Sequence, residues 1–180
     1  MKSIRRVFGL SILLVMLMTV SCNKDKKTTT GGKNENSNTI ENTQSKVEFI
    51  DKSTQEIYGT YLKIKNGLVN SNSKVVQEES KKIEAALDDS KDKEQLKATL
   101  KLISLTKNIE EQRGFFVTLT AEVEKLINAT EIKSGEIYKQ FCPMAFDGEG
   151  GYWLSDSKGI RNPYFGDKML KCGSVKSVLK

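Results

Sequence analysis

The sequence predicts an all-α protein, an antiparallel bundle of about four helices with an irregular C-terminal segment packed on one end. Two observations favour this fold class. Between residues 53 and 130, apolar side chains recur at helical intervals, and no strong alternating strand pattern appears before residue 131. From Tyr138 to Gly173 the chain becomes rich in glycine, proline and aromatic residues, and is too interrupted for a helix.

The N-terminus has the pattern of a secretory signal. Basic side chains within residues 2–6 precede an apolar run over residues 7–20, which is too short for a comfortable membrane span. The run ends at Cys22, and polar residues follow at once. This pattern resembles a bacterial lipoprotein signal, so we expect residues 1–21 to be removed and Cys22 to be lipidated. The alternative is an ordinary signal peptide that happens to contain a cysteine.

Residues 22–46 are expected to comprise the lipidated cysteine and a disordered tether. The stretch is mostly Thr, Asn, Lys, Gly and Ser, and cannot bury enough apolar surface to offset its ordering entropy. The folded domain is then expected over residues 47–175. A lipid anchor makes the membrane a partner and places the protein in the cell envelope, periplasm-facing or surface-exposed.

The helices are predicted from their caps and apolar stripes. Ser53 and Glu56 have the spacing of a capping box, and the first helix is expected to end near Asn70. Asn108, with Glu111 three residues later, indicates the start of a further helix. The stripes are interpreted as core, because none of them presents a cluster of carboxylates. The expected helix starts are Ser53, Ser73, a point after Ser90, and Asn108.

Composition narrows the function classes. Removal of the signal leaves 26 basic and 23 acidic residues, a net charge of +3, interspersed as on solvated helix faces. The sequence lacks a basic run with interleaved aromatics, so we expect no nucleic-acid partner. It also lacks histidine, which excludes histidine general bases, Ser-His-Asp triads and imidazole metal ligands. We therefore expect a binding protein and not an enzyme.

The C-terminal segment carries the residues with the most specific chemistry. Cys142 and Met144 stand at one end of it, and Met169 and Cys172 stand at the other. Thiolate and thioether sulfur select copper(I) and similar soft ions over hard cations. If the intervening loop brings the two units together, these sulfur atoms would enclose one Cu(I) ion.

The same cysteines allow two other interpretations. An exported compartment permits a disulfide between Cys142 and Cys172, and composition alone favours this bridge. Closing a loop of about thirty residues would stabilise the fold by roughly 3 kcal/mol, and Met144 and Met169 would then only fill space. A catalytic thiol is the third interpretation, and it is disfavoured because no histidine is present to activate it.

A family resemblance favours the soft-metal interpretation. The chain contains the runs YLKIKNGLV, QRGFF, CPMAFDGEGGYWLS and IRNPYFGDKMLKCG. From about Tyr58 to Val175 it resembles, in these runs, a Gram-negative exported domain family of unknown function. That domain also occurs fused to periplasmic adaptor subunits of copper and heavy-metal efflux pumps of the resistance-nodulation-division class. The resemblance implies a helical domain associated with copper or heavy-metal handling.

The resemblance also limits which ligands carry over. Cys142, Met144, Met169 and Cys172 match the family pattern, whereas a histidine that members often carry in the third-helix region is absent here. The Cys-Pro-Met opening is similar to short heavy-metal-binding modules of the same efflux systems, in which histidine commonly follows the methionine. Here Ala145 follows it, which indicates ligation by sulfur alone.

Supporting roles are predicted for four further residues. Asn162 and Pro163 are turn formers, and Trp153 and Tyr164 are expected to cap the open end of the bundle and exclude water from the sulfur atoms. Together these features predict an exported lipoprotein that binds Cu(I) for storage or for delivery to an efflux-pump adaptor or another envelope protein. The alternative is a disulfide-stapled domain that docks on such a partner and binds no metal.

Overall fold

The computed structural model describes residues 45–180, which fold into four α-helices and two antiparallel sheets. The predicted signal, Cys22 and nearly all of the predicted tether lie outside the described residues. The helices are α1 (Lys52–Val69), α2 (Ser73–Ala86), α3 (Glu94–Leu105) and α4 (Ile109–Asn128). The strands are β1 (Glu48–Phe49), β2 (Ile132–Ser134), β3 (Ile137–Cys142), β4 (Gly151–Ser155) and β5 (Ser174–Leu179), and the 3-10 turns are η1 (Lys91–Lys93), η2 (Phe146–Gly148) and η3 (Gly166–Met169).

The prediction of an all-α fold is wrong. The strands β4, β3 and β5, in that order, form an antiparallel sheet, and β1 pairs with β2. β3 and β4 come from the segment that we expected to be irregular. β3 contains Ile137, Tyr138 and Phe141, and β4 contains Tyr152 and Trp153, which are residue types that favour strands. β5 extends to Leu179, past the expected domain end at residue 175.

The helical part follows the sequence pattern closely. Successive helices pack against one another, and α1 also packs against α4. The caps differ in detail, because Asp51 caps α1 and Asn72 caps α2, each one or two residues before the predicted start. Asn108 caps α4 as predicted, with its side-chain oxygen accepting hydrogen bonds from two backbone N–H groups.

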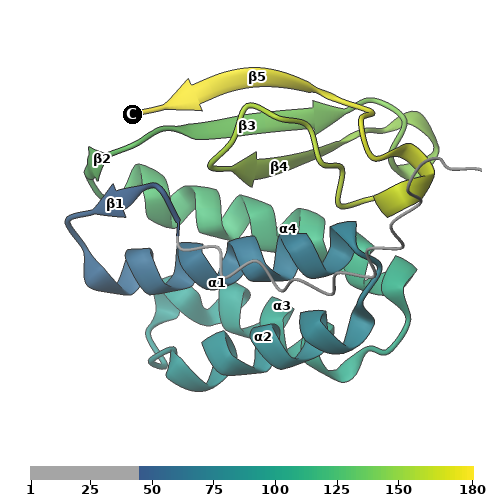
Figure 1. Ribbon diagram of the computed structural model, residues 1–180. Coiled ribbons are helices and arrows are strands. Elements are labelled where there is room, and N and C mark those ends of the chain that lie inside the picture. Colours follow the sequence, from purple (N-terminus) through teal and green to yellow (C-terminus); the bar gives the residue numbers. More distant parts are fainter. Residues whose placement is uncertain (1–44) are drawn as a thin grey trace, which may run out of the picture. The chain divides into compact units, whose positions relative to one another are not determined.

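One tyrosine connects the helices to the sheet. Tyr61 of α1 is fully buried, and its ring stacks on Phe116 of α4 with 5.1 Å between ring centroids. Its hydroxyl shares a 3.0 Å hydrogen bond with Thr120 and accepts a 2.9 Å bond from the backbone N–H of Leu154 in β4. In Figure 1 the sheet lies on one side of the helices, with β4 next to α4 and β5 at the far edge. Tyr61 thus provides an acceptor for a backbone N–H on the edge strand of the sheet that faces the helices.

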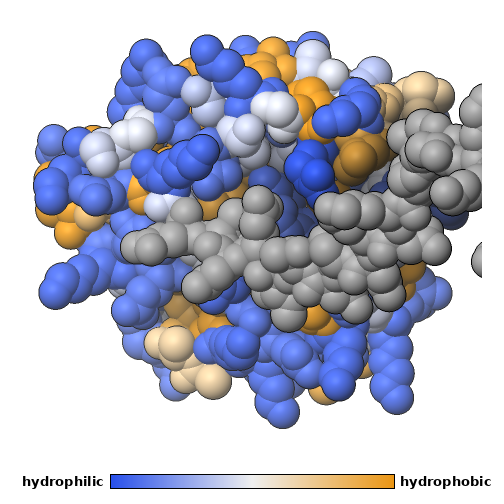
Figure 2. Space-filling view, in the orientation of Figure 1, coloured by the Kyte–Doolittle hydropathy of each residue, from blue (hydrophilic) through white to orange (hydrophobic). Residues whose placement is uncertain are grey.

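The surface carries mixed charges. On the face shown in Figure 2, hydrophilic side chains predominate and apolar ones are scattered among them. Exposed pairs such as Lys74 and Glu78, 3.8 Å apart on α2, contribute little to stability in water. Among residues 45–180, no helix combines the length and apolarity needed to cross a bilayer.

Lys65 is a buried amine between α1 and β4. The residue is 5% exposed, and its Nζ donates a 3.1 Å hydrogen bond to the Ser155 hydroxyl. Burial lowers the pKa of Lys65 from 10.5 to about 8, although the nearby carboxylate of Asp156 partly opposes this shift. Sequence reasoning missed this residue, whose one signal is its spacing of four residues from Tyr61 and three from Leu68 on the buried side of α1.

The depressed pKa of Lys65 predicts a pH-dependent stability. Between pH 8 and pH 10.5, the unfolded chain holds more protons on this amine than the folded chain does. The contribution of Lys65 to the free energy of unfolding therefore increases as the pH rises. We expect the stability of the wild type relative to Lys65→Met to increase by about 1 kcal/mol per pH unit in this window. Urea unfolding at several pH values measures this difference.

The matched control is Lys63→Met, a change at a half-exposed lysine on the same helix. Its stability relative to the wild type should stay flat across the same pH values, because the Lys63 side chain is half-exposed and loses little of its water on folding. A flat difference for Lys65→Met as well would contradict the predicted desolvation of this amine.

Candidate functional site

Cys142 is the last residue of β3 and lies in the core. Its side chain is fully buried, and its partner in the β3–β4 register is Gly151. A Cβ atom at Gly151 would lie 2.5 Å from the ring of Tyr164, so the missing side chain leaves room for that ring. The strand therefore places Cys142 opposite the glycine against which the Tyr164 ring packs.

Cys172 lies on the turn between η3 and β5, and backbone contacts hold it there. Its N–H donates a 3.0 Å hydrogen bond to the carbonyl of Met169. The next residue, Gly173, has φ +139°, and a Cβ atom there would lie 2.8 Å from the Trp153 ring and 2.9 Å from the carbonyl of Phe141. Only glycine allows the chain to pass this close to β3 without displacing either neighbour.

The turn and the strand bring the two cysteines together. The Sγ atoms of Cys142 and Cys172 are 3.0 Å apart, although the residues are 30 positions apart in the sequence, and both are free thiols. The hydrogen bond with Cys142, followed by burial, raises the pKa of the Cys172 thiol above its usual value. A ligand that needs the Cys172 thiolate must therefore displace its proton at neutral pH.

Asn162 fixes the loop that carries Cys172. Its side-chain amide donates a 2.9 Å hydrogen bond to the carbonyl of Cys172, and its side-chain oxygen accepts a 2.8 Å bond from the N–H of Tyr164. Its own backbone N–H donates to the carbonyl of Leu170. The residue is completely buried, so each of these bonds replaces one that water would otherwise make. Asn162 thus joins three backbone positions of this loop, at Tyr164, Leu170 and Cys172.

Trp153 and Tyr164 are aromatic residues of the C-terminal segment that pack against each other. Trp153 is fully buried and meets Tyr164 edge to face, with 6.0 Å between ring centroids. Tyr164 makes similar contacts with Phe116 of α4 and Phe146 of η2, at 6.1 Å and 5.1 Å. Its hydroxyl donates a hydrogen bond to the carbonyl of Tyr152. These rings join the sulfur-bearing turn to the helices.

Pro163 is held by an arginine whose role sequence reasoning missed. Arg113 of α4 is 3% exposed, and its Nε donates a 2.9 Å hydrogen bond to the carbonyl of Pro163. Its Nη2 donates to the carbonyl of Leu68 and to the hydroxyl of Ser71, both at 3.1 Å. The available signal was an arginine on the apolar side of a predicted helix. The structure assigns it the anchoring of the C-terminal loop to the end of α1.

The two methionines differ in their surroundings. Met144 is 58% exposed in the turn that follows Cys142. Met169 is half-buried at the end of η3, and its carbonyl binds the N–H of Cys172. The structure thus brings the two cysteines into contact and places Met144 largely in solvent. In the described part of the chain, no three cysteine, aspartate or glutamate side chains are grouped to hold a metal ion.

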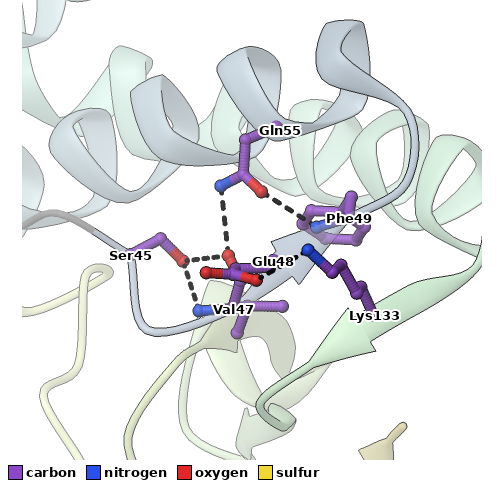
Figure 3. A pocket seen from close by; sticks show the side chains of 6 residues that line it. All are labelled: Ser45, Val47, Glu48, Phe49, Gln55 and Lys133. Atoms are coloured by element: carbon purple, nitrogen blue, oxygen red, sulfur yellow. Dashed lines mark hydrogen bonds and ion pairs between the residues drawn. The ribbon is translucent and has the colours of Figure 1, made fainter.

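A separate surface pocket lies where β1 meets α1 (Figure 3). Its polar groups bind one another: the side chain of Gln55 accepts a hydrogen bond from the N–H of Phe49 and donates one to the carbonyl of Val47. Lys133 and Glu48 form an ion pair of 3.6 Å across it. Because these groups are engaged in holding β1 in place, we interpret the pocket as structural.

The comparisons with known proteins concern the helices more than the cysteine site. Residues 57–135 match the model of a family described as "Protein of unknown function (DUF3347)". This match agrees with the predicted resemblance to an uncharacterised domain family. The matched residues run from α1 through β2 and end before β3, so the cysteine pair lies outside them. No curated protein and no solved structure matches the chain.

Proposed function

We propose that this protein binds a soft metal ion, foremost Cu(I), through the thiols of Cys142 and Cys172, for storage or for delivery to an efflux system. The observation that carries the proposal is the 3.0 Å contact between two free thiols from distant parts of the chain. Two thiolates on one chain offer the polarisable donors that Cu(I) prefers. No catalytic step is required, because the ion is accepted and passed on by ligand exchange.

The thiols need a small movement to share an ion. With metal–sulfur bonds of about 2.3 Å, two thiolates on one ion stand roughly 3.7 to 4.6 Å apart. The pair would open by movement of the Cys172 side chain, which is half-buried, whereas Cys142 is fully buried at the end of β3. Met144 and Met169 are the further ligands in this proposal, and the exposure of Met144 suits a residue that first meets the incoming ion.

The cellular part of the proposal rests on the sequence. A lipid on Cys22 would hold the domain at a membrane of the cell envelope, and the resemblance described above makes an efflux-pump adaptor the first partner to test. The second candidate function is a Cys142–Cys172 disulfide that staples a domain for docking on an envelope partner without any metal. The short distance between the sulfur atoms favours this candidate too, since a disulfide requires only a slight further approach.

Cu(I) titration distinguishes the two candidates. The experiment uses the full chain with Cys22→Ser, so that Cys142 and Cys172 are its only cysteines. Thiols are counted first, and the reduced protein is then titrated anaerobically against a competing Cu(I) chelator. We expect one ion per chain, loss of binding in Cys142→Ser, and binding weakened at least about tenfold in Met144→Leu and in Met169→Leu.

Val117→Leu, a change at an exposed apolar residue of α4, should bind like the parent protein and serves as the control. Failure of the reduced protein to bind Cu(I) would overturn the metal-binding proposal. If the untreated protein also has no titratable thiol, the disulfide-stapled docking domain becomes the supported function. Metal binding unaffected by either methionine change would restrict the site to the two thiols.

A further inference from the structure

The two cysteines of the pair differ in their exposure to solvent. Cys142 has no exposed surface and belongs to the main hydrophobic core. Cys172 is only partly covered and lies between the exposed Lys171 and the half-buried Gly173. Of the two cysteines, Cys172 therefore presents surface to a reagent in solution, whereas Cys142 presents none. Access of this kind decides which thiol of a pair reacts first with a disulfide.

The backbone around Cys172 is fixed on both sides. Its carbonyl accepts a hydrogen bond from Asn162 and its N–H donates one to Met169, while Gly173 is pressed against Trp153. The sulfur of Cys142 consequently remains beside that of Cys172 without an ordering cost. Pre-organised groups react as if at a very high concentration, so a second step between the two sulfur atoms would be fast.

We propose that Cys172 is the site at which a small disulfide, of the class of oxidised glutathione, modifies the protein, and that Cys142 resolves the product. In the first step, the Cys172 thiolate attacks the disulfide, forms a mixed disulfide and releases one small thiolate. In the second step, the Cys142 thiolate attacks the Cys172 sulfur and releases the other. The small disulfide is reduced to two thiols, which take up the two protons that the protein thiols lose.

This exchange regulates the proposed metal site, because the protein disulfide leaves neither thiolate for Cu(I). That consequence rests on the proposed function. The exchange itself rests on the separation and the unequal exposure of the sulfur atoms, and it can be tested without any metal. A protein that does not bind Cu(I) and a protein in which Cys172 does not react first are thus two results that can be told apart.

The test compares three full-length proteins that carry Cys22→Ser: one with both other cysteines, one with Cys142→Ser and one with Cys172→Ser. Each is incubated with oxidised glutathione and followed by intact-mass spectrometry. We expect a stable glutathione adduct on Cys172 in the Cys142→Ser protein. The Cys172→Ser protein should react at least about tenfold more slowly, because its remaining thiol is buried.

The protein with both cysteines should lose two hydrogen atoms in mass without accumulating an adduct, and a reducing agent should restore it. The same reactions in denaturant are the control, in which the two single-cysteine proteins should react at similar rates whatever their native stability. Equal rates under native conditions, or a lasting adduct in the protein with both cysteines, would overturn the proposal.

Discussion

Replacing Arg113 with alanine is expected to lower the free energy of unfolding by about 3–5 kcal/mol. Arg113 is 3% exposed, and its guanidinium donates to two backbone carbonyls from different segments, those of Leu68 and Pro163. Alanine would leave both carbonyls without this donor in a place that is closed to water. The carboxylate of Glu110, 2.8 Å from Nη1, is more exposed and contributes less. Urea unfolding followed by circular dichroism measures the loss.

Two further variants identify the cause of this loss. Arg161→Ala removes an exposed arginine of the anchored loop and should change the stability by less than about 0.5 kcal/mol. Arg113→Lys keeps the charge, but a single ammonium cannot reach acceptors on several sides, so an intermediate loss is expected. If Arg113→Ala were as mild as Arg161→Ala, the loop would not depend on this anchor.

Replacing Trp153 with alanine is expected to cost about 3–5 kcal/mol as well. The indole is fully buried, packs edge to face on Tyr164 and lies close to Gly173. Its removal opens a cavity between β4 and the turn that carries Cys172, and such a cavity collapses only partly. Trp153 is the only tryptophan, so unfolding is followed by circular dichroism and not by fluorescence.

Tyr152→Ala is the matched control for this change, because Tyr152 precedes Trp153 on the same strand and is 43% exposed. It should lose about 1 kcal/mol, mainly the contact with Phe141 at 4.5 Å between ring centroids. A comparable loss in the two variants would contradict the view that Trp153 is the packing centre of the C-terminal segment.

The helices could be predicted from the sequence because their signals are local. Ile57, Tyr61, Ile64 and Leu68 recur at helical spacing, and all of them are buried on α1. Asn108 was found from its position before an apolar stripe, and it caps α4. Each signal lies within one or two turns of a single element, so it needs no knowledge of the rest of the fold.

The sheet was missed because its signals were given the wrong weight. Glycine and proline around residues 143–151 and 163–173 were taken as evidence of irregular chain, whereas they bound the strands β3, β4 and β5. Ile137, Tyr138 and Phe141 are good strand formers within β3. When strands pair with partners far away in the sequence, the sequence of each strand alone carries only a weak signal of that pairing.

The sequence by itself determined the helical half, the absence of histidine chemistry and the choice of Cys142 and Cys172 as the residues to examine. Only the tertiary structure decided that these two cysteines meet, because their contact depends on the register between β3 and β5 and on the turn at Gly173. It likewise decided the roles of Arg113 and Lys65. A charged helix residue supports the fold in this way only when another segment of the chain packs over it and buries it. That packing involves segments far apart in the sequence, so no local pattern reveals it.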